Sequence, residues 1–347
     1  MTTVDPRPTE PAVDGPWPGV SVVMPVLNER RHLADAVGRV LAQDYPGPLE
    51  VVVALGPSHD GTGDLAAELA AADPRVRTVD NPTGRTPAGL NAALRVAAYD
   101  VIVRVDGHAL IPDDYVRAGV ETLQRTGADN VGGIMGAEGV TEFEQAVARA
   151  MTTKLGVGAA AFHVGGEEGP ADTVYLGCFR RSALERVGGY DEEFVRAQDW
   201  EMNHRIRDTG GLVWFTPRMH VTYRPRPTFG RLARQYFEYG RWRREVMRRH
   251  PETARLPGSA RYLAPPLAVT GVLAGTVAGV VGLVGGPGWL RLGWLAPAGY
   301  AAIIAAGAAV NGRGLERGAW VRLPAVYVAM HAAWGAGFLT SPDGLRG

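Results

Sequence analysis

Cysteine is almost missing from this chain of 347 residues. Cys178 is the only one, so the chain cannot form an internal disulfide or a thiolate metal cluster. Neither oxidative folding nor a structural zinc ion is therefore implied by cysteine usage. We expect Cys178 to be a small buried residue.

The chain also lacks a net formal charge, because 36 basic side chains balance 36 acidic ones. Nothing in this balance suggests a nucleic-acid partner. The charges are unevenly distributed: residues 20–255 hold nearly all the acids, whereas residues from about 262 onward are largely apolar and small. We therefore expect a soluble part followed by a membrane part.

A signal peptide is missing from the start of the sequence. The first nineteen residues contain five prolines and three acids, without a basic start or an apolar core. We expect residues 1–19 to form a disordered tail and the chain to begin in the cytoplasm.

Short apolar runs alternate with helical patterns over the next part of the chain. The predicted strands are Val20–Pro25, Leu49–Leu55, Val76–Val79 and a run from Val101 that ends at Asp106, with helices between them. Continuously apolar strands are typical of a mostly parallel α/β sheet that is buried on both faces. In such open sheets, ligands bind outside the carboxyl ends of the strands.

Polar clusters follow all four predicted strands. These clusters are Asn28-Glu29, Ser58-His-Asp-Gly-Thr62, Asn81 to Arg85, and Asp106 with His108. Any one of them can be an ordinary polar turn, and helix capping alone would explain Thr62 and Asp64 but not Asp60. Four clusters that converge on one edge predict a binding site.

Asp106 and His108 are candidate metal ligands. Residues two apart in a strand point to the same side, so both side chains could reach one divalent ion if the strand continues through them. A carboxylate beside an imidazole suits Mn²⁺ or Mg²⁺ held against phosphate, although zinc also accepts both ligand types.

Six short motifs occur together in one order and spacing. They are Val22-Val-Met-Pro-Val-Leu-Asn-Glu29, Ser58-His-Asp-Gly-Thr62, Val105-Asp-Gly-His108, Gly177-Cys-Phe-Arg-Arg181, Val187-Gly-Gly-Tyr-Asp191 and Gln198-Asp-Trp-Glu201. With them the chain resembles the family 2 glycosyltransferases from about Val20 to Trp242. This resemblance implies an inverting enzyme with the A-type, Rossmann-like nucleotide-sugar-binding fold. Within the family, enzymes that build succinoglycan-type exopolysaccharides share the Asp-x-His form.

The resemblance also implies roles for single residues. Asp199 would be the general base, and it also precedes a plausible helix as an N-cap; the two roles are compatible. Asp106 would hold Mn²⁺ or Mg²⁺ against the donor diphosphate, and His108 stands where the family usually has a second aspartate. His220 occupies a place where relatives often carry a histidine near the metal, although a lone histidine there is otherwise structural.

The expected substrate-binding residues surround these groups. Asp60 would recognise the nucleotide base, Glu29 would lie near the nucleoside, and Glu201 could support Asp199. The whole set is Pro25, Asn28, Glu29, Asp60, Arg85, Asn91, Arg180, Arg181, Gln198 and Glu201. Arg180 and Arg181 are either cations of an acceptor site or solvated surface charges.

A basic amphipathic helix is predicted over residues 228–250, after a catalytic domain over residues 20–227. Its apolar stripe is Phe229, Leu232, Ala233, Tyr236, Tyr239, Trp242 and Val246, and seven arginines surround it. This pattern favours a helix that lies at an anionic membrane surface. The alternative is an ordinary helix that packs domains together.

The membrane part is predicted over residues 262–340. Leu263–Val284, Leu292–Val310 and Leu323–Leu339 are near the length needed to cross a bilayer, and the third is short and contains His331. Gly271, Gly275, Gly279 and Gly282 could form one packing face. Arginines after the second segment place the catalytic domain in the cytoplasm. Three spans would then leave the C-terminus outside the cell.

The predicted function is transfer of a sugar from a nucleotide-sugar donor to a membrane-held acceptor, such as a lipid-linked glycan, with inversion. It would serve cell-envelope or exopolysaccharide synthesis at the bacterial cell membrane. Gln235 and Arg241-Trp242 lie too far apart for the family's Gln-x-x-Arg-Trp motif, which favours transfer of one sugar per encounter. The alternatives are a polyprenyl-phosphate sugar synthase and a catalytically silent scaffold that binds nucleotide sugar.

Overall fold

A mixed sheet of eight strands forms the centre of the computed structural model, which describes residues 16–255 and 259–345. The spatial order is β3-β2-β1-β4-β7-β5-β8-β6. The strands are β1 Val20–Val26, β2 Leu49–Leu55, β3 Val76–Asp80, β4 Val101–Arg104, β5 Asn130–Ala137, β6 Gly169–Pro170, β7 Tyr175–Arg180 and β8 Val213–Tyr223. Most of the expected tail over residues 1–19 lies outside the described residues.

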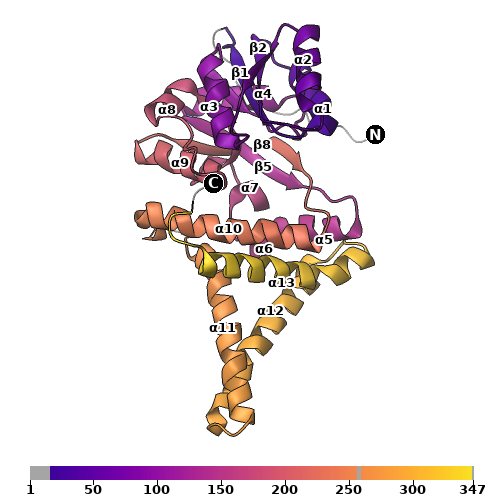
Figure 1. Cartoon of the computed structure of the whole chain (residues 1–347), viewed down its shortest axis with the longest axis vertical. Coiled ribbons are helices and arrows are strands. Elements are labelled where there is room, and N and C mark those ends of the chain that lie inside the picture. The colour runs from indigo at the N-terminus through magenta and orange to yellow at the C-terminus, as the bar shows by residue number, and fades with distance from the viewer. Residues whose placement is uncertain (1–15, 256–258, 346–347) are drawn as a thin grey trace, which may run out of the picture.

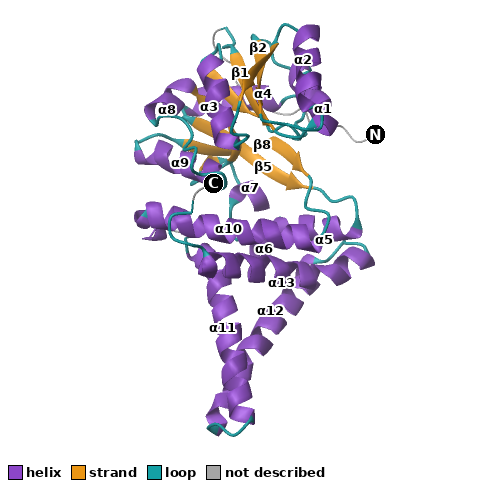
Figure 2. Cartoon of the chain, viewed as in Figure 1, coloured by secondary structure: helices purple, strands orange, loops and turns teal. Residues whose placement is uncertain are grey.

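Helices cover both faces of this sheet (Figure 2). The helices in this part of the chain are α1 Arg30–Leu41, α2 Thr62–Ala72, α3 Thr86–Val96, α4 Tyr115–Thr126, α5 Glu142–Met151, α6 Lys154–Val157, α7 Ala161–Val164, α8 Arg181–Arg186 and α9 Gln198–Asp208. Helices α1, α2 and α4 pack on one face of the sheet, and α3, α8 and α9 pack on the other. Strands β1 to β4 run parallel, β7 runs antiparallel between β4 and β5, and β5 is parallel to β8. The predicted α/β fold with a mostly parallel sheet is thereby confirmed.

The core lies on both faces because successive strand residues point to opposite sides. Val22 and Val51 pack toward α1, α2 and α4, whereas their neighbours Val23 and Val52 pack toward α3, α8 and α9. All four valines are 1% exposed or less. The unbroken apolar runs of β1 and β2 follow from this two-sided burial.

Strand β4 is shorter than the prediction required. It ends at Arg104, and Gly107 and His108 lie in a turn. The expectation that Asp106 and His108 project from one continuing strand is therefore wrong. Both residues still lie just past the carboxyl end of β4.

Two apolar helices project away from the sheet domain as a hairpin (Figure 1). These are α11 Ala260–Leu283 and α12 Leu295–Asn311, joined through the 3-10 helix η2 Gly288–Trp294. The segments Arg261–Leu283 and Gly288–Asn311 are long and apolar enough to cross a membrane. Gly275, Gly279 and Gly282 contact η2 or the start of α12, so three of the four predicted glycines pack as expected; the surroundings of Gly271 are open.

The third predicted span is wrong. Helix α13, Arg317–Thr340, lies beside α10, Phe229–Arg249, between the sheet domain and the hairpin (Figure 1). Many of its side chains are buried against protein, among them Leu323, Val326 and Tyr327. The chain then returns toward the catalytic domain, where Leu345 packs with Phe194 and Trp242 of that region. Among the described residues, the helices long and apolar enough to cross a membrane are therefore two, and they form a hairpin whose two ends lie on the same side.

The apolar stripe of α10 is largely used for packing. Leu232, Tyr236, Trp242 and Val246 are buried within the protein, whereas Phe229 is 53% exposed. The alternative of a helix that packs domains accounts for the four buried members. The position of α10 at a membrane surface stays a prediction.

Glycines allow α10 and α13 to approach closely. A Cβ at Gly240 would overlap the carbonyl oxygen of Trp334, and one at Gly337 would overlap that of Phe237. The two helices therefore contact each other through their backbones at two reciprocal points.

We expect Gly240→Ala to lower the free energy of unfolding by about 1–3 kcal/mol, because the added methyl group overpacks this helix crossing. The matched control is Gly230→Ala, on the same helix in open space. It should change stability by no more than about 1 kcal/mol. Thermal unfolding of the full chain in detergent measures the stability of both variants. Equal melting temperatures for Gly240→Ala and Gly230→Ala would contradict the close crossing.

Candidate active site

The first wall of the candidate site joins the loops that follow β1 and β2. Asn28 has a φ of 57°, in the left-handed region that asparagine tolerates better than most residues. Its backbone N–H donates to Ser58 Oγ at 2.9 Å, and its side-chain oxygen accepts from the His59 N–H at 2.9 Å. The two loops therefore hold each other in place at the carboxyl edge of the sheet.

Asp60 organises the same two loops. Its Oδ2 accepts from the Arg30 N–H at 3.1 Å, and its Oδ1 accepts from the Thr62 hydroxyl at 2.5 Å. These hydrogen bonds, that from Thr62 first, lower the pKa of Asp60 below its ordinary value. Helix α2 has no side-chain cap, so capping by Thr62 or Asp64 is wrong. The ionised carboxylate of Asp60 therefore holds the two loops together. This gives Asp60 a structural role, which helix capping did not explain.

The centre of the site is a buried arginine that bridges two carboxylates. Arg104, the last residue of β4, is 2% exposed. Its Nε donates to Asp106 Oδ1 at 3.0 Å, and its Nη1 donates to Asp199 Oδ1. Burial opposes the charge of Arg104, but the two carboxylates outweigh burial and raise its pKa well above the ordinary value. One guanidinium thus brings together the end of β4 and the start of α9.

Burial raises the pKa of Asp199 to about 6, against the opposing effect of Arg104. Asp106 raises it further, and a hydrogen bond from the Leu176 backbone lowers it. A carboxylate with this pKa is largely ionised at neutral pH and still basic enough to take up a proton. The side chain is 21% exposed, so a substrate can reach it.

Backbone strain gathers around Asp199. Within the described residues, Asn28, Leu176 and Ala197 are the non-glycine residues with positive φ. Ala197, at 58°, precedes the helix that carries Asp199, and Leu176, at 57°, hydrogen-bonds Asp199 through its backbone. Such conformations cost of order 1–3 kcal/mol each and cluster at functional sites.

Glu29 and His108 form a second pair at this edge. Glu29 Oε1 lies 2.7 Å from His108 Nδ1. This hydrogen bond is the main cause that raises the pKa of His108 above its ordinary value. Glu29 was expected near the nucleoside, and in the structure its carboxylate orients the imidazole.

The donor set fits a divalent metal ion. Asp106 is 21% exposed and Arg104 leaves lone pairs on its oxygens, while His108 is 51% exposed and keeps Nε2 for a ligand. A carboxylate on the far nitrogen, as Glu29 provides, is the usual support of a metal-binding histidine. His220 lies on β8 with its ring against Gly136, where a Cβ would overlap the imidazole.

Other predicted residues support the walls of the site. Asn91 on α3 donates to the Tyr190 carbonyl and accepts from the Tyr190 N–H, both at 2.8 Å, and so fixes the loop before α9. Pro25 is half-buried in β1 beside this helix, and Arg85 is exposed just before it. Gln198 is the first residue of α9, next to Asp199.

Three predicted residues face away from Asp106 and Asp199. Arg180 donates to the Ala128 and Leu123 carbonyls, and Arg181 donates to those of Tyr99, Leu94 and Ala97, at the opposite edge of the sheet. Neither reading given for these arginines, acceptor-site cations or solvated charges, describes them, because they bind main-chain carbonyls. Glu201 is buried, and its carboxylate pairs with Arg205. It lies two residues along the helix from Asp199 and does not support it.

Sequence reasoning missed Arg104 and Tyr190. Arg104 had a visible signal, since it is the one charged residue within the apolar run Val101–Val105. Tyr190 is buried and hydrogen-bonded to Arg104, and it had no signal beyond its place in Val187-Gly-Gly-Tyr-Asp191.

A mostly parallel sheet with Asp106 and Asp199 at its carboxyl edge agrees with the glycosyltransferase class that the motifs indicate. The family model for glycosyl transferase family 2 matches residues 21–188. The chain belongs to this family.

Particular relatives extend the match beyond the catalytic domain. The succinoglycan biosynthesis protein ExoA of Rhizobium meliloti is 34% identical over 320 residues, which cover 91% of this chain and 93% of that protein. A glucuronosyltransferase of Methanococcus voltae, named for a dolichyl N-acetylglucosaminyl phosphate substrate, is 23% identical over 64% of this chain and 71% of its own length. The chain is thus a glycosyltransferase of exopolysaccharide or glycan biosynthesis.

The fold also matches a solved glycosyltransferase. The mannosyltransferase PcManGT from Pyrobaculum calidifontis, determined with GDP-Man and Mn²⁺, aligns with a TM-score of 0.58 and 21% identity. The match covers 91% of this chain and 89% of that one. The A-type glycosyltransferase fold of the sheet domain is therefore shared, and the structural match extends over most of the rest of the chain.

We expect Arg104→Met to lower the free energy of unfolding by about 3–5 kcal/mol, because it leaves two carboxylates without their buried cation. Arg104→Met combined with Asp199→Asn should recover part of this loss, since one carboxylate is then neutral. Arg95→Met, at an exposed position of α3, is the control and should stay within about 0.5 kcal/mol. Denaturation in detergent provides the comparison, and a double variant no more stable than Arg104→Met would contradict the bridge.

Proposed function

We propose that this glycosyltransferase is a metal-dependent inverting enzyme that transfers one sugar from a nucleotide-sugar donor to a lipid-linked glycan at the cell membrane. The observation that carries the proposal is the guanidinium of Arg104, shared by Asp106 and Asp199. This shared cation holds both carboxylates close together. It therefore supports a role for Asp106 in metal binding and a role for Asp199 as the base that acts at the same sugar.

In the proposed reaction, Asp199 takes the proton of an acceptor hydroxyl. The hydroxyl oxygen forms a bond to the anomeric carbon as the bond from that carbon to the donor phosphate breaks, which inverts the configuration. The nucleoside diphosphate leaves with the electron pair of that bond. Burial of Asp199 supports this role, because a pKa of about 6 suits a base at neutral pH.

Asp106 and His108 would hold a divalent cation, and Glu29 would orient His108. When bound, Mn²⁺ or Mg²⁺ neutralises the charge that develops on the leaving diphosphate. The mannosyltransferase of similar fold was determined with Mn²⁺, which favours that ion.

The acceptor and the membrane location rest on the apolar hairpin. Leu267, Leu273, Val277 and Ile303 are each at least 59% exposed, which a water-facing helix rarely shows. Helix α11 has 24 residues, or about 36 Å at 1.5 Å per residue, enough for a hydrocarbon layer of about 30 Å. A membrane anchor would bring the enzyme close to a lipid-linked acceptor. The name of the Methanococcus voltae relative indicates such a substrate for that protein.

We expect Asp199→Asn to reduce transfer by about 10²–10⁴-fold, the usual contribution of a general base, while metal-dependent donor binding remains largely intact. Asp64→Asn is the control, because Asp64 also lies in the first turn of a helix but is exposed. Release of nucleoside diphosphate with membrane lipid extract measures transfer, and calorimetry measures donor binding. Retained transfer to a polyprenyl phosphate would remove Asp199 from the mechanism and favour the sugar-phosphate synthase.

We expect two spans, with the catalytic domain and the C-terminus both in the cytoplasm. Arg313, Arg317 and Arg322 follow the second span, whereas Arg291 lies at the hairpin tip, so the positive-inside rule supports this orientation. Cys178 is fully buried, so single cysteines introduced elsewhere report the topology. In intact spheroplasts a membrane-impermeant maleimide should label Trp289→Cys but not Arg313→Cys or Asp343→Cys. Labelling of Asp343→Cys there would indicate a third span.

A further inference from the structure

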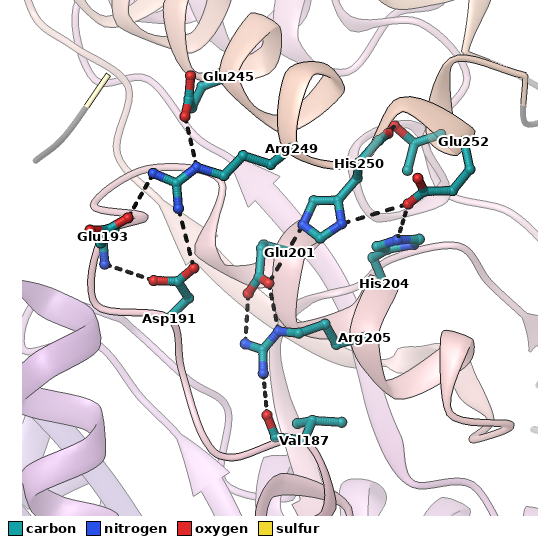
Figure 3. A network of polar contacts seen from close by, with 11 residues as sticks. Val187, Asp191, Glu193, Glu201, His204, Arg205, Glu245, Arg249, His250 and Glu252 are labelled. Atoms are coloured by element: carbon teal, nitrogen blue, oxygen red, sulfur yellow. Dashed lines mark hydrogen bonds and ion pairs between the residues drawn. The ribbon is translucent and has the colours of Figure 1, made fainter. Parts of the chain in front are cut away.

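A cluster of two histidines and a carboxylate, none of them a residue of the candidate active site, lies where the end of α10 meets α9 (Figure 3). His204 comes from the middle of α9. His250 follows the last residue of α10, and Glu252 lies in the 3-10 helix η1, Pro251–Arg255. Within the described residues these three form the one group of at least three histidine, cysteine or carboxylate side chains whose ligand atoms lie close enough to share a metal ion.

The distances between the ligand atoms approach those of a coordination sphere. His204 Nε2 lies 3.0 Å and His250 Nδ1 lies 3.6 Å from Glu252 Oε1, and all three ligand atoms lie within 4.8 Å of one another. Ligands at about 2.0–2.1 Å from Zn²⁺ in a tetrahedron stand about 3.3 Å apart. Small side-chain rotations therefore suffice to form three bonds.

A buried carboxylate lies behind the cluster. The other ring nitrogen of His250, Nε2, faces Glu201 Oε1 at 3.9 Å, and Glu201 is itself fixed by Arg205 at 2.5 and 2.7 Å. A carboxylate behind the ligand histidine is the usual support in zinc proteins. Buried Glu201, which pairs with Arg205, thus also lies behind His250.

Apolar rings hold the two imidazoles from the sides. Trp200 stacks on His204 with a centroid distance of 5.2 Å and an interplanar angle of 16°, and Phe194 flanks His250 at 6.4 Å. The side chain of Glu252 is 55% exposed, so an ion and its water can reach the cluster from solvent. His204 is 7% exposed, so the imidazole closest to the core is already desolvated.

The donor set selects the kind of ion. Two imidazoles and one carboxylate suit Zn²⁺, whereas Mg²⁺ and Ca²⁺ prefer oxygen ligands alone. Three protein ligands leave a fourth position for water.

We propose that His204, His250 and Glu252 bind one Zn²⁺ ion that fastens α9, the helix bearing Asp199, to the end of α10. The two helices are already adjacent, because Arg243 of α10 lies over the Trp200 ring at 4.7 Å. The ion joins segments 46 residues apart along the chain. The ion thereby connects α9, which positions Asp199, to the helices next to the apolar hairpin. The site uses no ligand of the candidate active site and is independent of the proposed function.

The test measures zinc bound to the full chain, purified in detergent through a tag that contains no histidine. The protein is stripped with chelator, incubated with Zn²⁺, desalted and analysed for metal and for melting temperature. Wild type should retain one zinc equivalent more than His204→Gln or Glu252→Gln and should melt several degrees higher with zinc than without it. The two variants should show no such shift.

Two control variants separate this site from others. Asp106→Asn removes a ligand of the candidate active site, and His32→Gln removes an exposed histidine of α1; both should keep the equivalent. Equal zinc in wild type and His204→Gln, or loss of the equivalent in Asp106→Asn, would overturn the proposal. Glu252 is exposed, so Glu252→Gln keeps the test decisive if His204→Gln fails to fold.

Discussion

The ion pairs of Arg104 are the constraint on which the site depends. A buried guanidinium must be paired, and here its partners come from the end of β4 and from the first turn of α9. Because β4 lies in the middle of the sheet and α9 packs on one face, these pairs fix where a helix start meets a strand end. The strained backbone at Leu176 and Ala197 is held by the same assembly.

The molecule is organised around contacts between parts distant in sequence. Asn91 holds the loop before α9, and Asp60 and Asn28 join the first two loops of the sheet. On the membrane side, α10 and α13 meet through glycines, and α13 carries the chain back toward the catalytic domain. The hairpin of α11 and α12 exposes many of its apolar side chains, so the reactive groups and the proposed membrane anchor lie in separate layers of the protein.

Physical reasons explain where the sequence patterns misled. Hydropathy alone does not distinguish a membrane span from a helix whose apolar residues are buried by protein. For this reason the sequence of α13 was predicted to be a span. The apolar stripe of α10 is ambiguous for the same reason, because such a stripe can face either lipid or protein. Arg180 and Arg181 sit in a family motif, but sequence does not show which edge of a sheet a side chain faces. Antiparallel β7 ends where parallel β4 begins, and both arginines therefore lie at the edge opposite the site.

The sequence by itself determined the α/β fold, the edge of the sheet where ligands bind, and the family, because apolar strand runs and ordered motifs are local patterns. It also predicted Asp106, His108 and Asp199 as the reactive groups. Only the tertiary structure decided that Arg104 joins two of them, that Glu29 orients the third, and that Glu201 faces a histidine cluster. Those pairings depend on how distant segments meet, and burial then sets the charges of the groups that meet there.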